Sequence, residues 1–279
     1  MSRTSELHQQ QNEAAVPTKK EKTPLEKINK RAWSASSINK LMNQPAAWIL
    51  SYVYNVRGSG SAAMSRGLAA EVGYDAFCHS EFGSIEDAVS EATRYFNKET
   101  ALQGGDEAKR DKERNALDGF IRQAIEAFEP YGFPTSSQGK LHLKMDGVQD
   151  PWIGYDDYNF APLPGDPRPI TIDLKTTHRM PSKINDMHRR QMGLYQLMKP
   201  DHRILICYCT SKKHAIYEMT MEEAIEIGET LKIAAQTGEK MINLFDNPKE
   251  LSTLYAPDFD SFYFGDTITR NEARRVWGY

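Results

Sequence analysis

Asp173 and Lys175 stand two positions apart at the end of an apolar, β-branched stretch, residues 169–174 (PITIDL). On a strand, side chains two positions apart point to the same face, so this pair would lie together while Leu174 points to the opposite side. A carboxylate beside an ammonium at a strand end can hold a cation and a bound anion. It can equally be a plain ion pair, worth under about 1 kcal/mol if exposed. The pattern alone leaves both interpretations open.

A second carboxylate is expected next to this pair. Asp157 ends the segment Gly154-Tyr-Asp-Asp, on an extended stretch (residues 151–160) that we expect beside the strand of Asp173. Hard divalent cations such as Mg²⁺ take oxygen ligands, commonly one or two carboxylates together with phosphate and water. Alternation turns Asp156 to the other face, as a solvated or supporting carboxylate. Asp157 and Asp173 therefore predict two carboxylates at one edge of a sheet.

Two flanking segments carry further polar side chains at helical spacing. Upstream, Gly67 precedes Glu71 by one turn, and we interpret this glycine as permitting a close approach. Downstream, Gln191 and Tyr195 are four positions apart and share one face of a helix. Both helices are therefore expected to present polar groups to the strand that carries Asp173.

The elements that position these residues follow a mixed order. Apolar spacing and capping residues predict short helices around residues 38–42 and from Pro45, and longer ones over 62–79, 84–100, 107–129, 183–198 and 220–244, with a basic helix near the C-terminus. Alternation and β-branched residues predict strands over 139–145, 151–160, 169–174, 202–210 and 215–219. This order predicts an α/β protein. We expect a disordered polar and basic tail (1–31) and one domain (32–279), made of a helical lobe (32–130), a sheet core (131–219) and C-terminal helices (220–279).

The composition excludes several classes of protein. The 279 residues are 39% hydrophobic and 26% charged with a net charge of −3, which excludes a wholly disordered or collagen-like chain. The longest apolar stretch, residues 46–56, is far shorter than the roughly 20 residues of a membrane span. Residues 1–24 lack the apolar core of a secretory signal. Three cysteines form no disulfide framework, and they predict free thiols in a soluble, cytoplasmic protein.

Four short motifs, taken together and in order, resemble the PD-(D/E)XK nuclease superfamily in its RecB-like branch. That branch carries G-x-x-x-(H/E) on a first helix, G-x-x-D on a strand, D-x-K on the next strand and Q-x-x-x-Y on the following helix. This sequence has Gly67…Glu71, Gly154…Asp157, Asp173-Leu-Lys175 and Gln191…Tyr195. With RGLAAE upstream and SASSINKL near the start, the chain is most similar to exonucleases of tailed bacteriophages. The resemblance implies a restriction-endonuclease-like core, a central mixed β-sheet flanked by helices.

The resemblance also implies a catalytic site. One or two Mg²⁺ or Mn²⁺ ions would be held by a set of oxygen ligands, namely Glu71, Asp157, Asp173 and the backbone carbonyl of Leu174. Lys175 would position the attacking water and offset charge on the phosphate. Gln191 and Tyr195 would orient Lys175, a metal-bound water or the DNA backbone. The four cysteines of the iron–sulfur relatives are missing, so no such cluster is expected.

Several residues are candidates for contact with DNA. They are Ser36, Arg66, Thr176, Arg189 and Arg190. Ser36 and the three arginines have a plainer alternative, because serines near a helix start are commonly caps and arginines commonly solvate a helix face. His178 and His188 are expected at the surface or beside a phosphate, since hard cations prefer oxygen ligands.

The function implied is that of a metal-dependent DNA exonuclease, a hydrolase of phosphodiester bonds in phage DNA recombination, replication or degradation, acting in the host cytoplasm. The substrate would be single- or double-stranded DNA with a free end, and a phage annealing or replication protein is an expected partner. Two alternatives from the same fold are an endonuclease and a catalytically inactive DNA-binding module. A subunit that loads a recombinase is a third.

Overall fold

A five-stranded mixed sheet forms the centre of the computed structural model, which describes residues 21–79, 84–103 and 106–279. The strand order is β1-β4-β5-β6-β7, and only the β5–β6 pair is parallel. The bounds are β1 Ser136–Ser137, β4 Tyr158–Phe160, β5 Ile170–Thr176, β6 Arg203–Cys209 and β7 His214–Met219. A separate antiparallel pair joins β2 (Lys140–Leu143) to β3 (Trp152–Tyr155). The chain is therefore an α/β protein with a mixed sheet, as expected.

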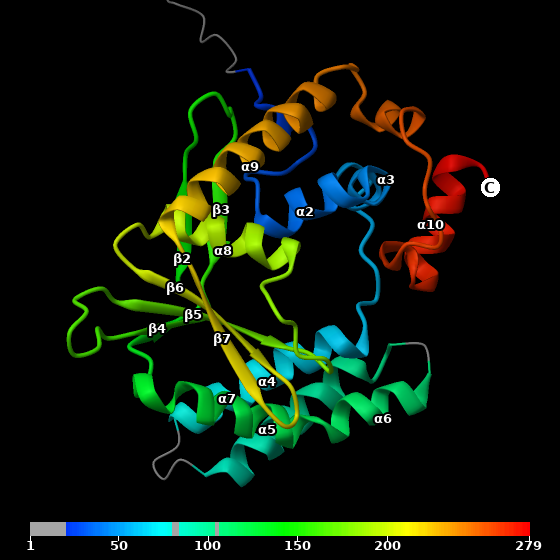
Figure 1. Ribbon diagram of the computed structural model, residues 1–279. Helices are drawn as coiled ribbons and strands as arrows, with labels where there is room; N and C mark the ends of the chain where they lie inside the picture. Colours follow the sequence, from blue (N-terminus) through cyan, green and yellow to red (C-terminus); the bar gives the residue numbers. More distant parts are fainter. Residues whose placement is uncertain (1–20, 80–83, 104–105) are drawn as a thin grey trace, which may run out of the picture.

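Helices cover both faces of this sheet (Figure 1). On one side lie α2 (Ala35–Asn43), α8 (Asp186–Met198) and α9 (Met221–Ile242), and on the other α4 (Ala62–His79), α5 (Ile85–Thr100) and α7 (Leu117–Phe128). α8 is the crossover that a parallel pair requires, because it joins β5 to β6. The remaining helices are α1 Pro24–Lys27, α3 Pro45–Trp48, η1 Ile49–Val53, α6 Glu107–Asn115, η2 Glu129–Tyr131, η3 Pro248–Thr253, η4 Phe262–Phe264 and α10 Thr267–Trp277.

Strand β5 separates two apolar cores. Ile172 and Leu174 are buried with side chains of α4 and α7, whereas Thr171, Asp173 and Lys175 alternate with them and point to the side of α8. The second core contains side chains of α2, α8, α9 and β6. The alternation predicted for residues 169–174 is confirmed, and it delivers polar groups to the boundary between the sheet and α8.

Several helix starts are confirmed by their caps. Ser34 and Thr220 each form a complete capping box, at α2 and α9, and Ser84 caps α5. The helix expected over 107–129 is instead two helices, because the backbone at Ala116 leaves ideal helical geometry between the solvated α6 and the amphipathic α7. The strand expected over 151–160 is also two strands in different sheets, and β1 was not foreseen.

The expectation of a disordered tail to residue 31 is wrong for its last part. Residues 24–27 form α1, with a capping box between Thr23 and Glu26 and with Pro24 at the first turn. Leu25 and Ile28 are buried in the core beside α9. The reason is tertiary, since two apolar side chains in a polar segment find a hydrophobic surface to cover. Residues 1–20 lie outside the described part.

The three cysteines are free, as predicted, with Cys207 and Cys209 buried on one face of β6 and Cys78 half-buried. Within residues 21–79, 84–103 and 106–279, none of the helices has the length and apolar character needed to cross a membrane.

Candidate active site

Asp157 and Asp173 face each other where the sheet forks. The β4–β5 ladder ends at the pair Tyr158↔Ile172, and the next residue on each strand is one of these two aspartates. Beyond this point the chain before β4 turns away to join β3, so there is no further ladder pair to hold the strands together. Asp157 Oδ2 instead accepts a hydrogen bond from the Leu174 amide at 2.9 Å. The two expected carboxylates therefore come together at one sheet edge.

Lys175 lies between these two carboxylates. Its ammonium forms an ion pair with Asp173 and is 3.9 Å from Asp157 Oδ2 and 3.4 Å from the Leu174 carbonyl oxygen. Burial lowers the pKa of Lys175, but the surrounding carboxylates outweigh burial and raise the pKa above its ordinary value. Lys175 is therefore a protonated ammonium held at the fork.

Glu71 brings a third carboxylate from α4. Burial and the negative charges of Asp173 and Asp75 raise the pKa of Glu71 to about 7, against the attraction of Lys175. Burial and the neighbouring carboxylates also hold the pKa of Asp157 well above its usual range, and burial raises that of Asp173. Three acids are thus crowded into a space with one ammonium, and each ionisation makes the next more costly.

The donor set suits a hard divalent cation. Asp173 is 1% exposed, and apart from the ion pair with Lys175 its Oδ2 has no hydrogen-bond partner among the described residues. In the same part of the chain, no three His, Cys, Asp or Glu side chains are placed to hold a metal ion as they stand, and the Lys175 ammonium pairs with two of the acids. Crowded carboxylates with a buried, poorly paired oxygen are groups that a divalent cation would compensate.

Gln191 and Tyr195 reach this site from α8 through a short chain of hydrogen bonds. Gln191 Nε2 donates to Asp173 Oδ1 at 2.9 Å and is 3.0 Å from the Tyr195 hydroxyl. That hydroxyl donates to the backbone carbonyl of Tyr155 at 2.6 Å. The two side chains therefore tie α8 to β5 and to the end of β3, and they hold Asp173 in place.

Gly154 makes this arrangement possible. A Cβ atom at Gly154 would lie 2.7 Å from Cε1 of the Tyr195 ring, which is closer than van der Waals contact allows. Gly67 differs, because a Cβ there would meet only Thr176 Oγ1 at 3.7 Å, an ordinary contact. The close approach expected at Gly67 is therefore absent from the described part of the protein, whereas Gly154 has one that sequence reasoning did not assign.

Arg66 and Thr176, two of the candidate DNA contacts, are bound to each other. The Arg66 guanidinium donates to the Thr176 hydroxyl at 3.2 Å and carbonyl at 3.0 Å, and it forms an ion pair with Glu113. It also lies over the ring of Phe120, with its central carbon 4.9 Å from the ring centroid, and Arg66 is only 5% exposed. The buried guanidinium therefore links α4, α6 and β5. The sequence alone does not distinguish this structural role from phosphate binding.

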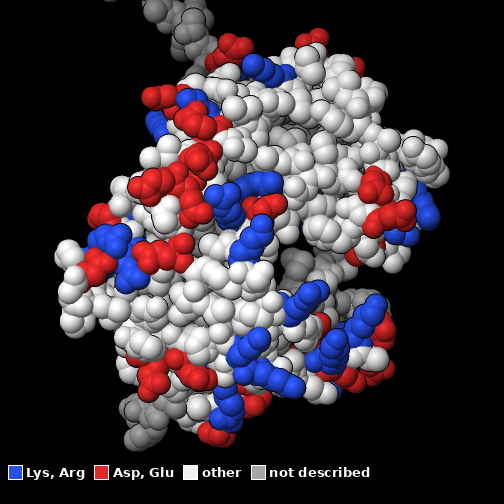
Figure 2. Space-filling model, in the orientation of Figure 1, with Lys and Arg blue, Asp and Glu red and all other residues white. Residues whose placement is uncertain are grey.

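The other candidate DNA contacts lie at the surface. Ser36 is exposed, while Ser34 is the residue that caps α2. Arg189 pairs with Glu223 at 3.2 Å, and Arg190 donates to Asn39 Oδ1 at 2.8 Å. Lys and Arg side chains gather over the middle of the face shown in Figure 2 and over the region of α6, whereas acidic side chains follow α9.

Asp156 and two histidines complete the environment of the site. Asp156 does point away from the fork, but it is buried rather than solvated, because it accepts from the Gly139 amide at 2.8 Å and from Lys199 at 2.8 Å. His178 is exposed and lies 2.9 Å from Glu113 Oε2. His188 is half-buried with Nδ1 2.8 Å from the Tyr208 hydroxyl, a contact that sequence reasoning missed.

Comparisons with known proteins add little to this geometry. The sequence matches no model of a protein family, and it matches none of the curated proteins searched. Among solved structures, the chain is similar to one titled "Crystal structure of SSO0001", at 16% identity over 52% of this chain and 73% of that chain, with a TM-score of 0.30. A likeness this remote indicates neither a fold nor a function.

Proposed function

We propose that this protein is a Mg²⁺- or Mn²⁺-dependent DNA exonuclease of the PD-(D/E)XK superfamily, in its RecB-like branch. One observation carries the proposal: three carboxylates, from α4, from the residue just before β4 and from β5, surround one lysine at the fork of the sheet, and the pKa of each acid is raised. Such strongly perturbed groups are typical of catalytic sites. The order of the elements, with α4 before the sheet and α8 crossing from β5 to β6, also agrees with this fold.

Glu71, Asp157, Asp173 and the carbonyl of Leu174 would hold the cation. When bound, the cation supplies a polarised phosphate and a water of lowered pKa. Lys175 would orient that water and offset the charge that develops on the phosphate oxygens. Gln191 keeps the carboxylate of Asp173 fixed through its bond to Oδ1, and Tyr195 holds Gln191.

An endonuclease of this fold would use the same catalytic site. An inactive DNA-binding module would bind DNA at this surface without cleaving it. The intact set of three acids, one lysine and one glutamine favours catalysis over binding alone. The preference for DNA with a free end, a phage annealing or replication protein as partner, and action in the host cytoplasm rest on the sequence resemblance and belong to the proposal.

Digestion of end-labelled DNA tests the proposal. Linear single- and double-stranded DNA and circular DNA are incubated with Mg²⁺, Mn²⁺ or EDTA. The variants are Asp173→Asn and, as a matched control, Asp201→Asn, which changes an exposed aspartate in the turn before β6. We expect metal-dependent loss of the linear DNA only, retained in Asp201→Asn and abolished in a folded Asp173→Asn.

Three other outcomes would point to a different function or a different site. Cleavage of circular DNA favours the endonuclease. DNA binding without cleavage by the folded wild type favours the binding module. Full activity in Asp173→Asn refutes the assignment of the site.

A further inference from the structure

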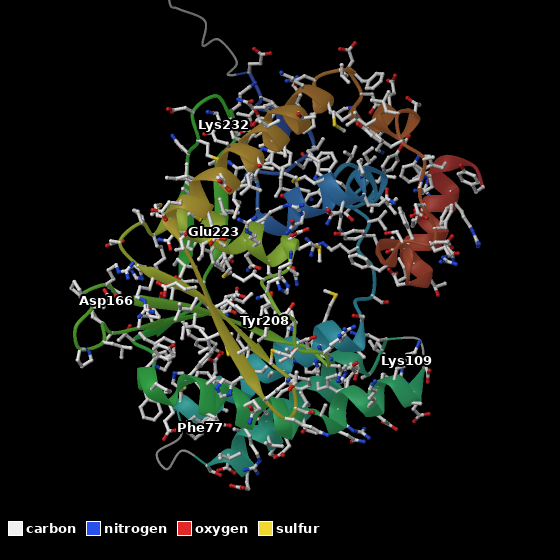
Figure 3. The ribbon with its side chains drawn as sticks, viewed as in Figure 1. Phe77, Lys109, Asp166, Tyr208, Glu223 and Lys232 are labelled. Carbon is white, nitrogen blue, oxygen red and sulfur yellow. The ribbon has the colours of Figure 1, made fainter. Side chains whose placement is uncertain are left out.

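His188 lies beside the proposed catalytic lysine, and the proposed function gives it no part in catalysis. It is on α8 one turn before Gln191, so it shares the helix face that contacts Asp173. Its Nδ1 is 2.8 Å from the hydroxyl of Tyr208, and Tyr208 is the register partner of Lys175 in the parallel β5–β6 pair. Tyr208 lies near the centre of the view in Figure 3. The imidazole is therefore held at the level of Lys175 along the sheet.

The hydrogen bonds around His188 determine which ring nitrogen carries the proton. Asn185 Oδ1 accepts from the backbone amide of His188 at 2.9 Å, so the other amide atom, Nδ2, is a donor. This donor is 2.9 Å from His188 Nδ1. Nδ1 must then be an acceptor, for Asn185 Nδ2 and for the Tyr208 hydroxyl, and a neutral ring carries its proton on Nε2.

The ring is neutral, and its Nε2 faces solvent. Burial and the positive charge of Lys175 lower the pKa of His188 to about 4. Within the residues that the structure describes, the buried side-chain atoms without a hydrogen-bond partner are Trp48 Nε1, Trp152 Nε1 and Asp173 Oδ2. Nε2 of this half-buried histidine is not one of them and has no protein partner in that part of the chain, so it keeps access to solvent.

We infer that His188 is a substrate-binding residue: a neutral Nε2–H donor, held in one tautomer by Asn185 and Tyr208, that binds a backbone phosphate of nucleic acid next to the scissile bond. The inference rests on the proposed function, because it needs a nucleic acid in the site. The donor has a fixed direction, unlike the flexible ammonium of a lysine, and it adds no positive charge next to Lys175. It therefore fixes the position of the phosphate without adding charge to the site.

The first test measures the tautomer in the free protein. Long-range ¹H–¹⁵N spectra of the histidine side chains distinguish a protonated Nε2 from a protonated Nδ1. We expect His188 to be the Nε2–H tautomer at neutral pH, and the double variant Asn185→Ala/Tyr208→Phe, which lacks both donors to Nδ1, to leave a mixture of tautomers. A protonated Nδ1 in the wild type overturns the inference whether or not the protein cleaves DNA.

The second test measures DNA affinity in Ca²⁺, with labelled linear oligonucleotides that each carry one methylphosphonate near the labelled end. The variants are His188→Leu, His188→Gln, which restores an N–H donor, and His142→Leu, the same change at an exposed histidine of β2. Loss of a hydrogen bond to a charged phosphate corresponds to roughly 10- to 100-fold in affinity. We expect this loss in His188→Leu, partial recovery in His188→Gln and none of it in His142→Leu.

At one position of the oligonucleotide, the methylphosphonate should lower the DNA affinity of the wild type but cause no further loss of affinity in His188→Leu. Two results overturn the inference while the proposed function stands. One is a loss of affinity from the methylphosphonate that adds to the loss from His188→Leu at every position of the oligonucleotide. The other is unchanged DNA affinity in a folded His188→Leu. Wild-type protein that neither binds nor cleaves DNA refutes the proposed function itself, and the tautomer experiment then tests the geometry of His188 alone.

Discussion

Replacing Glu71 with glutamine should stabilise the metal-free protein above pH 7. Burial and neighbouring acids raise the pKa of Glu71 from 4.5 to about 7, so the folded protein retains a proton that the unfolded chain releases between these values. Stability then falls as the pH rises through this window, since the folded state binds more protons. At about 1.4 kcal/mol per pH unit, the rise in pKa corresponds to a loss of at most about 3 kcal/mol above pH 7.

The assay is urea unfolding in EDTA at pH 4.5 and at pH 8.5. Glutamine has the size of the protonated acid and cannot ionise, so Glu71→Gln should match the wild type at the lower pH. At the higher pH it should exceed the wild type by up to about 3 kcal/mol in the free energy of unfolding. The control is Glu226→Gln, an exposed glutamate on α9.

Added Mn²⁺ should reverse the order at pH 8.5. A cation bound by the ionised acids stabilises the folded wild type by mass action, and the variant with one carboxylate fewer gains less. If Glu71→Gln differs from the wild type by the same amount at both pH values, then Glu71 is not crowded by the other acids, and the electrostatic argument for the site is wrong.

Three further variants test other parts of the site. Gln191→Ala should keep the fold and lower the rate of DNA cleavage by roughly 10- to 100-fold, as loss of groups that orient metal ligands commonly does; an unchanged rate at saturating Mg²⁺ would show that Asp173 needs no such support. Gly154→Ala should destabilise the protein by about 1–3 kcal/mol, since its Cβ would collide with the Tyr195 ring. Gly67→Ala is the comparison, and thermal unfolding should find it close to the wild type; equal losses in both would contradict the packing described. Arg66→Met should cost about 1–3 kcal/mol in urea unfolding, because it removes the ion pair with Glu113, which still has His178 beside it, and both hydrogen bonds to Thr176. The salt dependence of DNA binding should stay the same; a smaller salt slope would identify Arg66 as a phosphate contact.

The residues of the site were largely predictable from the sequence, and their partners were not. Alternation along residues 169–174 put Asp173 and Lys175 on one face, and the spacing of Gln191 and Tyr195 put both on one helix face; the structure confirms both. These are local properties of strands and helices, with periods of two and about 3.6 residues, so they are visible in a single segment.

Contacts between distant segments were decided by the tertiary structure. Arg66 looked like a phosphate-binding residue, but folding brings Glu113 and Thr176 to it and leaves it 5% exposed. The need for glycine at position 154 depends on a ring that comes from α8. The second hydrogen bond to His188 Nδ1 comes from Tyr208, twenty positions away.

The local pattern of this protein thus determined which side chains share a face, because that depends only on backbone geometry. Burial, pKa and the choice of hydrogen-bond partner depend on what the rest of the chain brings to each side chain. The crowding of Glu71, Asp157 and Asp173 is such a property: α4 and the forked sheet bring the three acids together, and their proximity and burial, not their separate identities, raise the pKa of each.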